Sequence, residues 1–325
     1  MTESRCPPSV PASRAPASQD ADRADSRSPT AAACAAIFLW CWSAVCMAKG
    51  GRLMGQMALL ALTAGVGTAT AVLLQACRRR PLRDLVRLPA KALAAGFIGI
   101  ACYSVILFWA LGMANDADVG QVALLNYLWP IWTVLFSIVL LEKTARPWPT
   151  IAGAVLGFAG VVVARGPAAF LTPPSSLLPH GLALLGGILW ALYCVSLKRW
   201  RIPEGQGGPA LHFAECTVMA AVAAAFMGEW RSFPTLTPEM IGWVLFAGIG
   251  PIGLGYTLWE IGVKKGNLQL LSLLAYFIPV GAAILIAIFF RASCSWGLIP
   301  GALMIALGAW LATRANAKPT TKDNR

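Results

Sequence analysis

Long apolar runs, separated by short polar segments, occupy most of this sequence. A window of about 20 residues, the length with which a helix crosses the hydrocarbon core of a bilayer, detects ten runs. The sequence therefore predicts an all-α integral membrane protein. Its ten transmembrane helices are expected at residues 31–48, 57–77, 91–113, 118–141, 147–165, 180–198, 209–228, 240–262, 267–290 and 296–313.

An internal repeat runs through these helices. Leu39-Trp40 recurs as Leu189-Trp190 and Trp109-Ala-Leu-Gly112 recurs as Trp259-Glu-Ile-Gly262, both at an offset of 150 residues. Tyr127-Leu-Trp-Pro130 recurs as Tyr276-Phe-Ile-Pro279 at an offset of 149 residues. Three matches in one register indicate a duplication of a five-helix unit.

Five is an odd number, so the second copy enters the membrane upside down relative to the first. The prediction is thus two inverted five-helix repeats, the architecture of many secondary transporters. We expect residues 31–165 to form the first repeat and 180–313 the second. Residues 1–30, rich in Ser, Pro, Ala, Arg and Asp, are expected to be a disordered cytoplasmic tail, and 314–325 a second cytoplasmic tail.

The net charge of +12 raises the question of nucleic-acid binding, but the distribution of charge excludes it. The charged fraction is 12%, too low to cover a water-facing surface. If both termini are cytoplasmic, 21 of the 26 Lys and Arg residues fall on the inside. This asymmetry is typical of an inner-membrane protein with both termini in the cytoplasm.

No catalytic or metal-binding motif changes this picture. The nine cysteines lack CxxC spacing and most fall within apolar runs, where a free thiol acts as a small hydrophobe. HExxH, GxSxG and Walker A patterns are absent, and only two histidines occur. The sequence predicts no catalytic residue, no metal site and no cofactor.

One stretch carries a family resemblance. After Pro130 come Leu141-Glu142, Trp148-Pro149 and a glycine-rich helix with Gly153, Gly157 and Gly160. With the repeat, this stretch resembles the EamA-type ten-helix members of the drug/metabolite transporter superfamily, over about residues 31–315. Arg291 departs from that pattern, because it replaces the second glutamate. The helix 1 Leu-Trp pair and the run from Asn126 to Pro130 are most similar to bacterial aromatic amino acid exporters.

Proline and glycine interrupt several predicted helices. Pro130 and Pro279 lie near the middle of helices 4 and 9, so the carbonyls of Asn126 and Ala275 lose their helical donors. This indicates either a packing kink alone or a kink that also contacts substrate. The run from Gly248 to Gly255 in helix 8 indicates either a hinge or close packing. The predicted hinge residues are Pro130, Gly248, Gly250, Pro251, Gly253 and Pro279.

Aromatic and neutral polar residues near midspan are the candidates for substrate binding. Aromatic side chains near helix ends commonly form interfacial belts, whereas those at midspan need a buried partner for their polar atom. The predicted substrate-binding residues are Trp40, Tyr103, Asn126, Tyr127, Trp129, Trp190, Tyr193 and Tyr276.

His212 and Glu215 lie three residues apart on one face of helix 7. They are interpreted as a buried pair or as a site of proton coupling. The motifs Gly153-xxx-Gly157 and Gly297-xxx-Gly301 allow close helix approach. They fit packing within a monomer or a homodimer through helices 5 and 10.

These residues favour one function. The midspan candidates are aromatic, apolar or neutral-polar, and no Lys or Arg lies at midspan to bind a phosphate. The resemblance implies export of amino acids, aromatic ones preferred, by alternating access. A passive facilitator, or an exporter of other small metabolites or drugs, remains the alternative. The expected partners are the small-molecule substrate and the lipid bilayer.

Overall fold

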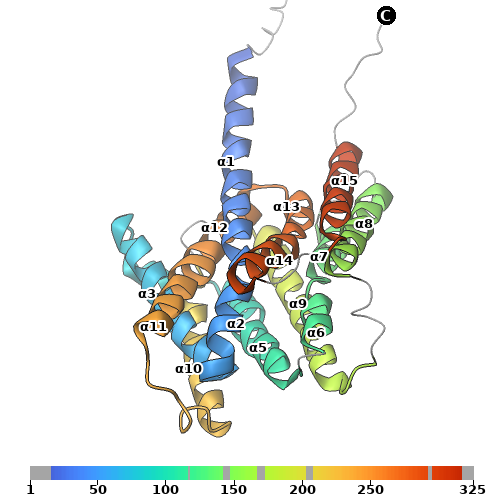
Figure 1. Ribbon diagram of the computed structural model, residues 1–325. Coiled ribbons are helices and arrows are strands. Elements are labelled where there is room, and N and C mark those ends of the chain that lie inside the picture. Colours follow the sequence, from blue (N-terminus) through green and yellow to red (C-terminus); the bar gives the residue numbers. More distant parts are fainter. Residues whose placement is uncertain are drawn as a thin grey trace, which may run out of the picture.

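The computed structural model describes residues 16–115, 118–141, 147–166, 173–202, 208–291 and 295–316, and these residues form helices without strands (Figure 1). The first half comprises α1 (Pro16–Cys41), α2 (Ser43–Met54), α3 (Gln56–Cys77), η1 (Leu82–Leu85), α4 (Ala90–Gly96), η2 (Phe97–Cys102), α5 (Tyr103–Met113), α6 (Val119–Asn126), α7 (Trp129–Leu140) and α8 (Pro147–Arg165). The second comprises α9 (Leu177–Arg199), α10 (Pro209–Phe226), α11 (Pro238–Ala247), η4 (Gly248–Leu254), α12 (Gly255–Lys265), α13 (Leu268–Leu274), α14 (Phe277–Phe290) and α15 (Leu298–Asn316).

These elements join into the predicted spans. In the described residues, nine helical stretches are long and apolar enough to cross a membrane. Numbered in chain order as helices 1 to 9, they are Ser28–Gly51, Gln56–Cys77, Ala90–Met113, Val119–Leu140, Pro147–Arg165, Leu177–Arg199, Pro209–Phe226, Pro238–Lys265 and Leu268–Phe290. A shorter apolar helix, Leu298–Arg314, completes the second half as helix 10. The all-helical membrane fold in two halves is confirmed.

The N-terminal helix extends further than the sequence indicated. α1 begins at Pro16, so residues 16–30, expected in a disordered tail, are helical here. The start of α1 and the C-terminal end of α15 lie at the same end of the bundle (Figure 1). Both chain ends therefore leave from one side, as an even number of spans requires.

The repeat is visible in irregular backbone as well as in helix order. Helix 3 of the first half contains the π-helical turn η2, and helix 8 contains the π-helical turn η4 at the matching position. Helix 4 breaks after Asn126, and helix 9 breaks after Leu274. π-Helical turns inside α-helices are frequent at functional sites, because they reposition backbone carbonyls. The two halves thus place interruptions at corresponding depths.

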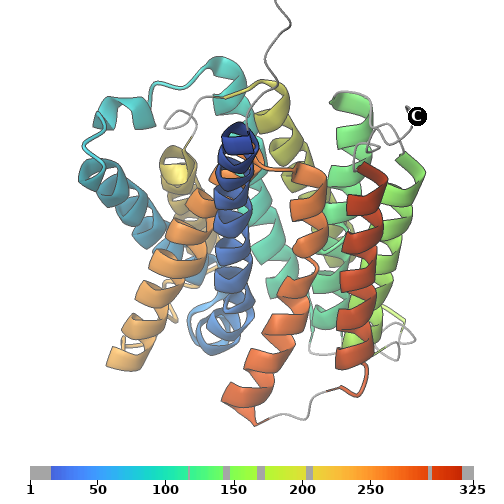
Figure 2. The ribbon, with the colours of Figure 1, turned by 90° about the horizontal axis from the view of Figure 1, so that it is seen from above.

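α8 and α15 form a close pair at one edge of the bundle (Figures 1 and 2). A Cβ atom added at Gly301 would lie 2.4 Å from the Gly160 carbonyl oxygen, and one at Gly308 would lie 2.4 Å from that of Gly153. Only glycine permits such an approach. Both glycine motifs are therefore used between helices 5 and 10 of the same chain.

Candidate functional site

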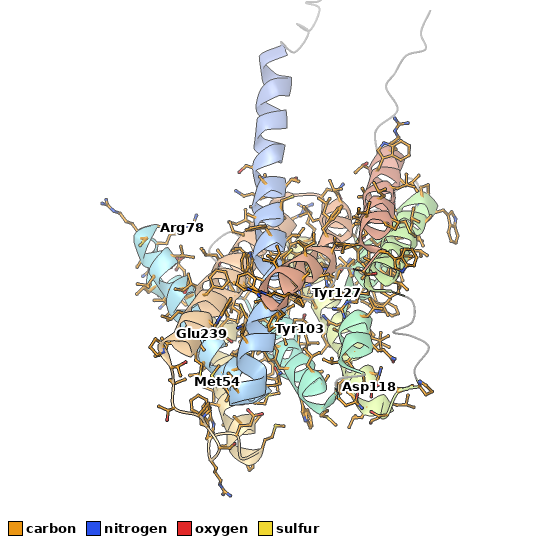
Figure 3. The ribbon with its side chains drawn as sticks, in the orientation of Figure 1. Met54, Arg78, Tyr103, Asp118, Tyr127 and Glu239 are labelled. Atoms are coloured by element: carbon orange, nitrogen blue, oxygen red, sulfur yellow. The ribbon has the colours of Figure 1, made fainter. Side chains whose placement is uncertain are left out.

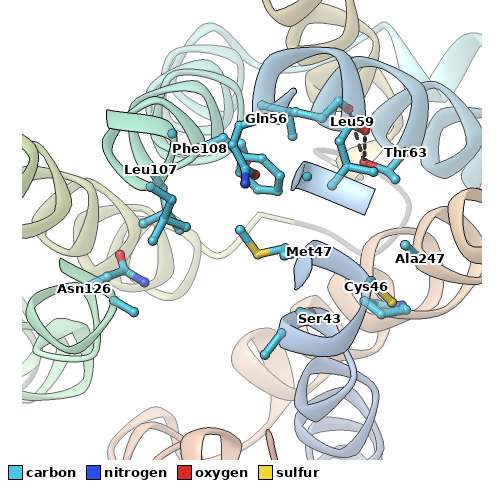
Figure 4. Close-up of a pocket in the computed structure, with 18 of the residues that line it drawn as sticks. Ser43, Cys46, Met47, Gln56, Leu59, Thr63, Leu107, Phe108, Asn126 and Ala247 are labelled. Carbon is cyan, nitrogen blue, oxygen red and sulfur yellow. Dashed lines mark hydrogen bonds between the residues drawn. The ribbon is translucent and has the colours of Figure 1, made fainter. Parts of the chain in front are cut away.

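A cavity of about 700 Å³ lies between the two halves. Its volume falls within the range of about 300–1,000 Å³ that is usual for small-molecule sites. The close-up in Figure 4 shows Ser43, Met47 and Gln56 from the first helices facing Leu107 and Asn126 across it. The cavity extends from midspan to the end of the bundle opposite the chain ends, where Gly112 and Glu229 lie.

Aromatic rings form the floor of this cavity. Trp40 and Trp190 meet edge to face with ring centroids 5.9 Å apart, and Tyr256 lies 5.3 Å from Trp40 and 5.2 Å from Trp190. Trp129 is nearly perpendicular to Trp190 at 6.2 Å. These separations are those of favourable aromatic pairs. The floor thus combines residues from both repeats.

Trp40 also joins helix 1 to the π-helical turn of helix 8. Its indole Nε1 donates to the Pro251 carbonyl at 2.9 Å. The close fit requires glycine, since a Cβ at Gly255 would approach the same Nε1 to 2.9 Å. The Pro251 carbonyl belongs to the π-helical turn, and the Trp40 indole supplies a donor for it. No unpaired carbonyl is then buried at this position.

The break in helix 4 presents polar groups beside the floor. Asn126 Nδ2 donates to the Tyr103 hydroxyl at 3.5 Å, and both residues line the cavity. The backbone carbonyl of Asn126 faces Gly187, where a Cβ would lie 2.9 Å away. In the second half, the Ala275 carbonyl accepts the Ile278 N–H at 3.0 Å. Ala275 is also buried outside the cavity lining, so the prediction that its carbonyl is free to meet substrate is wrong.

On the far side of the floor, toward the end of the bundle where the chain ends lie, the bundle is closed. Trp259 lies against Trp40 at 5.2 Å and donates to Cys194 Sγ at 3.4 Å. Further out, Lys198 Nζ donates to the Gly266 carbonyl at 2.7 Å. Gln269 Nε2 donates to Ser137 Oγ at 3.0 Å. The cavity therefore opens toward one side of the membrane only.

Comparison with known proteins agrees with this architecture. The EamA-like transporter family model matches twice, over residues 28–166 and 177–314. The chain belongs to the EamA-like transporter family. The two matches coincide with the two structural halves, which supports the inverted repeat.

Relatives of this EamA-family chain include exporters. It is 32% identical over 284 residues to the aromatic amino acid exporter YddG of Ancylobacter novellus, covering 86% of this chain and 94% of the relative. It is 30% identical over 250 residues to YddG of Salmonella typhimurium, covering 72% and 81%. A solved structure described as a crystal structure of protein matches with a TM-score of 0.77 at 28% identity, covering 90% of this chain and 99% of that one.

Most of the predicted binding residues of this EamA-family chain meet at the cavity. Its lining includes Trp40, Tyr103, Asn126, Tyr127, Trp129 and Trp190. Tyr193 is buried behind the floor, with its ring centroid 5.5 Å from that of Trp190. Tyr276 lies in a separate core cluster against Phe158 at 6.4 Å and outside the lining. At the break in helix 9 its side chain points toward α8 and α15, where it packs with Val161 and Ile305.

The predicted hinge residues occupy the irregular segments. Pro130 is at the start of α7 after the break in helix 4, and Pro279 is at the start of α14. Gly248, Gly250, Pro251 and Gly253 all lie within η4 and are buried. Of these, Pro251 lines the cavity. Motion at these positions stays a prediction.

His212 and Glu215 form the predicted pair. His212 Nδ1 lies 2.9 Å from Glu215 Oε2, and the imidazole is fully buried. The opposite ring nitrogen points at Gly96 of α4, where a Cβ would lie only 1.9 Å away. The pair lies behind the wall that Phe213 and Cys216 of the same helix present to the cavity. Proton coupling through it stays a prediction.

The sequence reasoning missed several cavity residues. Tyr256 belongs to the floor, and its only signal in the sequence is its place among the midspan aromatic residues. Gln56, Arg165 and Glu229 line the mouth at helix ends, whereas the sequence analysis drew its binding candidates from midspan positions. Glu229 accepts the Ala58 N–H at 2.7 Å and so satisfies the start of α3.

A polar clasp, which we define as the hydrogen-bonded residues Asn115, Asp118 and Ser175, lies beside the mouth. Asp118 accepts hydrogen bonds from both the Ser175 hydroxyl and the Ser175 N–H, the latter at 3.0 Å. These bonds hold the pKa of the Asp118 carboxyl below its usual range. Asn115 Oδ1 accepts the Asp118 N–H at 2.8 Å. The clasp ties the connection before α9 to the start of α6.

The indole bond of Trp40 makes a direct prediction. Trp40→Phe removes the donor to Pro251 but keeps an aromatic ring, and costs about 1 kcal/mol of local stability. Hydrogen–deuterium exchange of peptides covering residues 248–255 is then expected to be about fivefold faster. Trp42→Phe is the control, because Trp42 packs on Phe246 and Phe289 instead. Equal exchange in both variants would contradict the structural role of the bond.

Proposed function

We propose that the protein is a secondary transporter that exports small neutral solutes, most of all amino acids with aromatic side chains, by alternating access. The observation that carries this proposal is the aromatic floor of Trp40, Trp129, Trp190 and Tyr256 inside a cavity of about 700 Å³ between inverted repeats. The YddG relatives named as aromatic amino acid exporters support the same substrate class.

The chemistry of the lining fits an amphipathic zwitterion. Aromatic faces stabilise an ammonium group by cation–π attraction, worth about 2 kcal/mol when desolvated. The same rings pack against the flat apolar body of an aromatic side chain. Asn126 and the Tyr103 hydroxyl add neutral hydrogen-bonding groups at the floor. Contacts of this kind are individually modest, so we propose broad selectivity and low affinity.

A passive facilitator is the second candidate. The contacts of Trp259, Lys198 and Gln269 close the cavity on one side, and this one-sided closure favours a carrier instead. A facilitator needs a path through both sides in one conformation, whereas a carrier needs only one open side at a time. Other small metabolites or drugs remain alternative cargo for the same cavity.

We also propose that the protein resides in the inner membrane with both termini in the cytoplasm. Arg78 follows α3 at the end of the bundle where α1 starts, and Asp118 lies toward the opposite end (Figure 3). The basic cluster of the second-to-third-helix connection is therefore on the side of the chain ends. The positive-inside rule assigns that side to the cytoplasm. In this orientation the cavity opens outward.

Reporter fusions test the orientation. Fusions after residues 83 and 201 are expected to report cytoplasm, because both positions follow basic clusters. Fusions after residues 116 and 231 are expected to report periplasm. A cytoplasmic signal after residue 231 would contradict the inverted arrangement of the second repeat.

Transport by proteoliposomes tests the substrate. Wild-type protein is expected to move radiolabelled Phe, Trp and Tyr but no sugar phosphate. Trp190→Leu removes a ring at the centre of the floor and is expected to lower transport at low substrate concentration about tenfold. Trp310→Ala is the control, since Trp310 stacks with Arg314 on the outer face of α15. Transport of a phosphorylated sugar and of no amino acid by the wild type would overturn the substrate class.

A further inference from the structure

The cationic side chain of Arg165 reaches the cavity. Arg165 ends α8, is only half-buried, and lines the cavity. Its Nη1 donates to the Gly120 carbonyl, in the first turn of α6, at 3.4 Å. This long bond is the one hydrogen bond between the guanidinium and a described residue, and a guanidinium has five N–H donors.

The charges around the cavity leave Arg165 as its free cation. Among the described lining residues, Arg165 is the one positive side chain and Glu229 the one negative. Glu229 is already engaged by the N–H groups of Ala58 at 2.7 Å and Met57 at 3.4 Å. The nearest carboxylate in sequence to Gly120, that of Asp118, accepts both hydrogen bonds of Ser175. No ion pair of Arg165 occurs among the described residues.

The distance between the mouth and the floor of the cavity can be estimated along α6. Gly120 and Asn126 are six residues apart on α6, which corresponds to a rise of about 9 Å. Tyr127, which follows Asn126, lines the same cavity as Arg165. The guanidinium at the mouth and the aromatic floor are thus separated by about the length of a small molecule.

We propose that Arg165 binds the carboxylate of the transported amino acid, while the aromatic floor receives its side chain. The guanidinium offers paired N–H donors that match a carboxylate, which is the strongest neutralising contact available in this cavity. This inference rests on the proposed function and deepens it. It makes the carboxylate, and not the ring alone, a requirement for recognition.

A ligand pair separates carboxylate recognition from general damage. Phenylalanine carries the ring, the ammonium and the carboxylate, whereas phenylalaninamide has a neutral carboxamide in place of the carboxylate. Proteoliposomes with wild type, Arg165→Gln and Arg165→Lys are assayed for the KM of labelled phenylalanine. Phenylalaninamide is added as an unlabelled competitor. Arg291→Gln is the matched control, because Arg291 is exposed at the C-terminal end of α14 and outside the lining.

Arg165→Gln is expected to raise the KM for phenylalanine about 10- to 100-fold and to leave inhibition by phenylalaninamide unchanged. Arg165→Lys is expected to recover part of the loss, and Arg291→Gln to behave as wild type. An unchanged KM in Arg165→Gln, or equal weakening of both ligands, would overturn the assignment. Failure of the wild type to transport any amino acid would instead overturn the proposed function.

Discussion

Every backbone N–H and carbonyl inside a bilayer must find a partner, and this constraint decides where the chain departs from a regular helix. The departures occur at η2, at η4 and at the breaks in helices 4 and 9, and each of these segments includes residues buried against other helices. At η4 the constraint is met by a side chain, because the Trp40 indole donates to the Pro251 carbonyl at 2.9 Å. The same bond brings an aromatic ring to the centre of the bundle.

The cavity follows from these interruptions. Interrupted helices pack less uniformly at midspan, and the inverted repeat brings the interruptions of both halves to one depth. The rings of Trp40 and Trp129 from the first half then meet Trp190 and Tyr256 from the second. Above this floor the bundle is hollow, whereas below it Trp259 and Cys194 complete the packing. The pseudo-symmetric sequence thus adopts an asymmetric, one-sided conformation.

The spans and the duplication could be predicted because each helix needs about 20 apolar residues and because the aromatic motifs recur in register. Six of the eight predicted binding residues line the cavity, because polar and aromatic side chains at midspan turn toward the interior of the bundle. Tyr193 and Tyr276 do not, since periodicity gives depth and not the direction in which a helix face points. Arg165 and Glu229 escaped prediction because their roles depend on helix ends brought together from distant parts of the chain.

The central claim is that one cavity opens to each side in turn, and sided thiol labelling tests it most directly. In a variant without native cysteines, Met47→Cys lies in the open cavity and Ser137→Cys lies under the closed side, beside Gln269. A membrane-impermeant reagent should label Met47→Cys from outside and leave Ser137→Cys unlabelled from inside. When saturating phenylalanine is added inside, labelling of Met47→Cys should fall as labelling of Ser137→Cys rises. Labelling of both positions at once in a double variant, without this reciprocal change, would contradict alternating access.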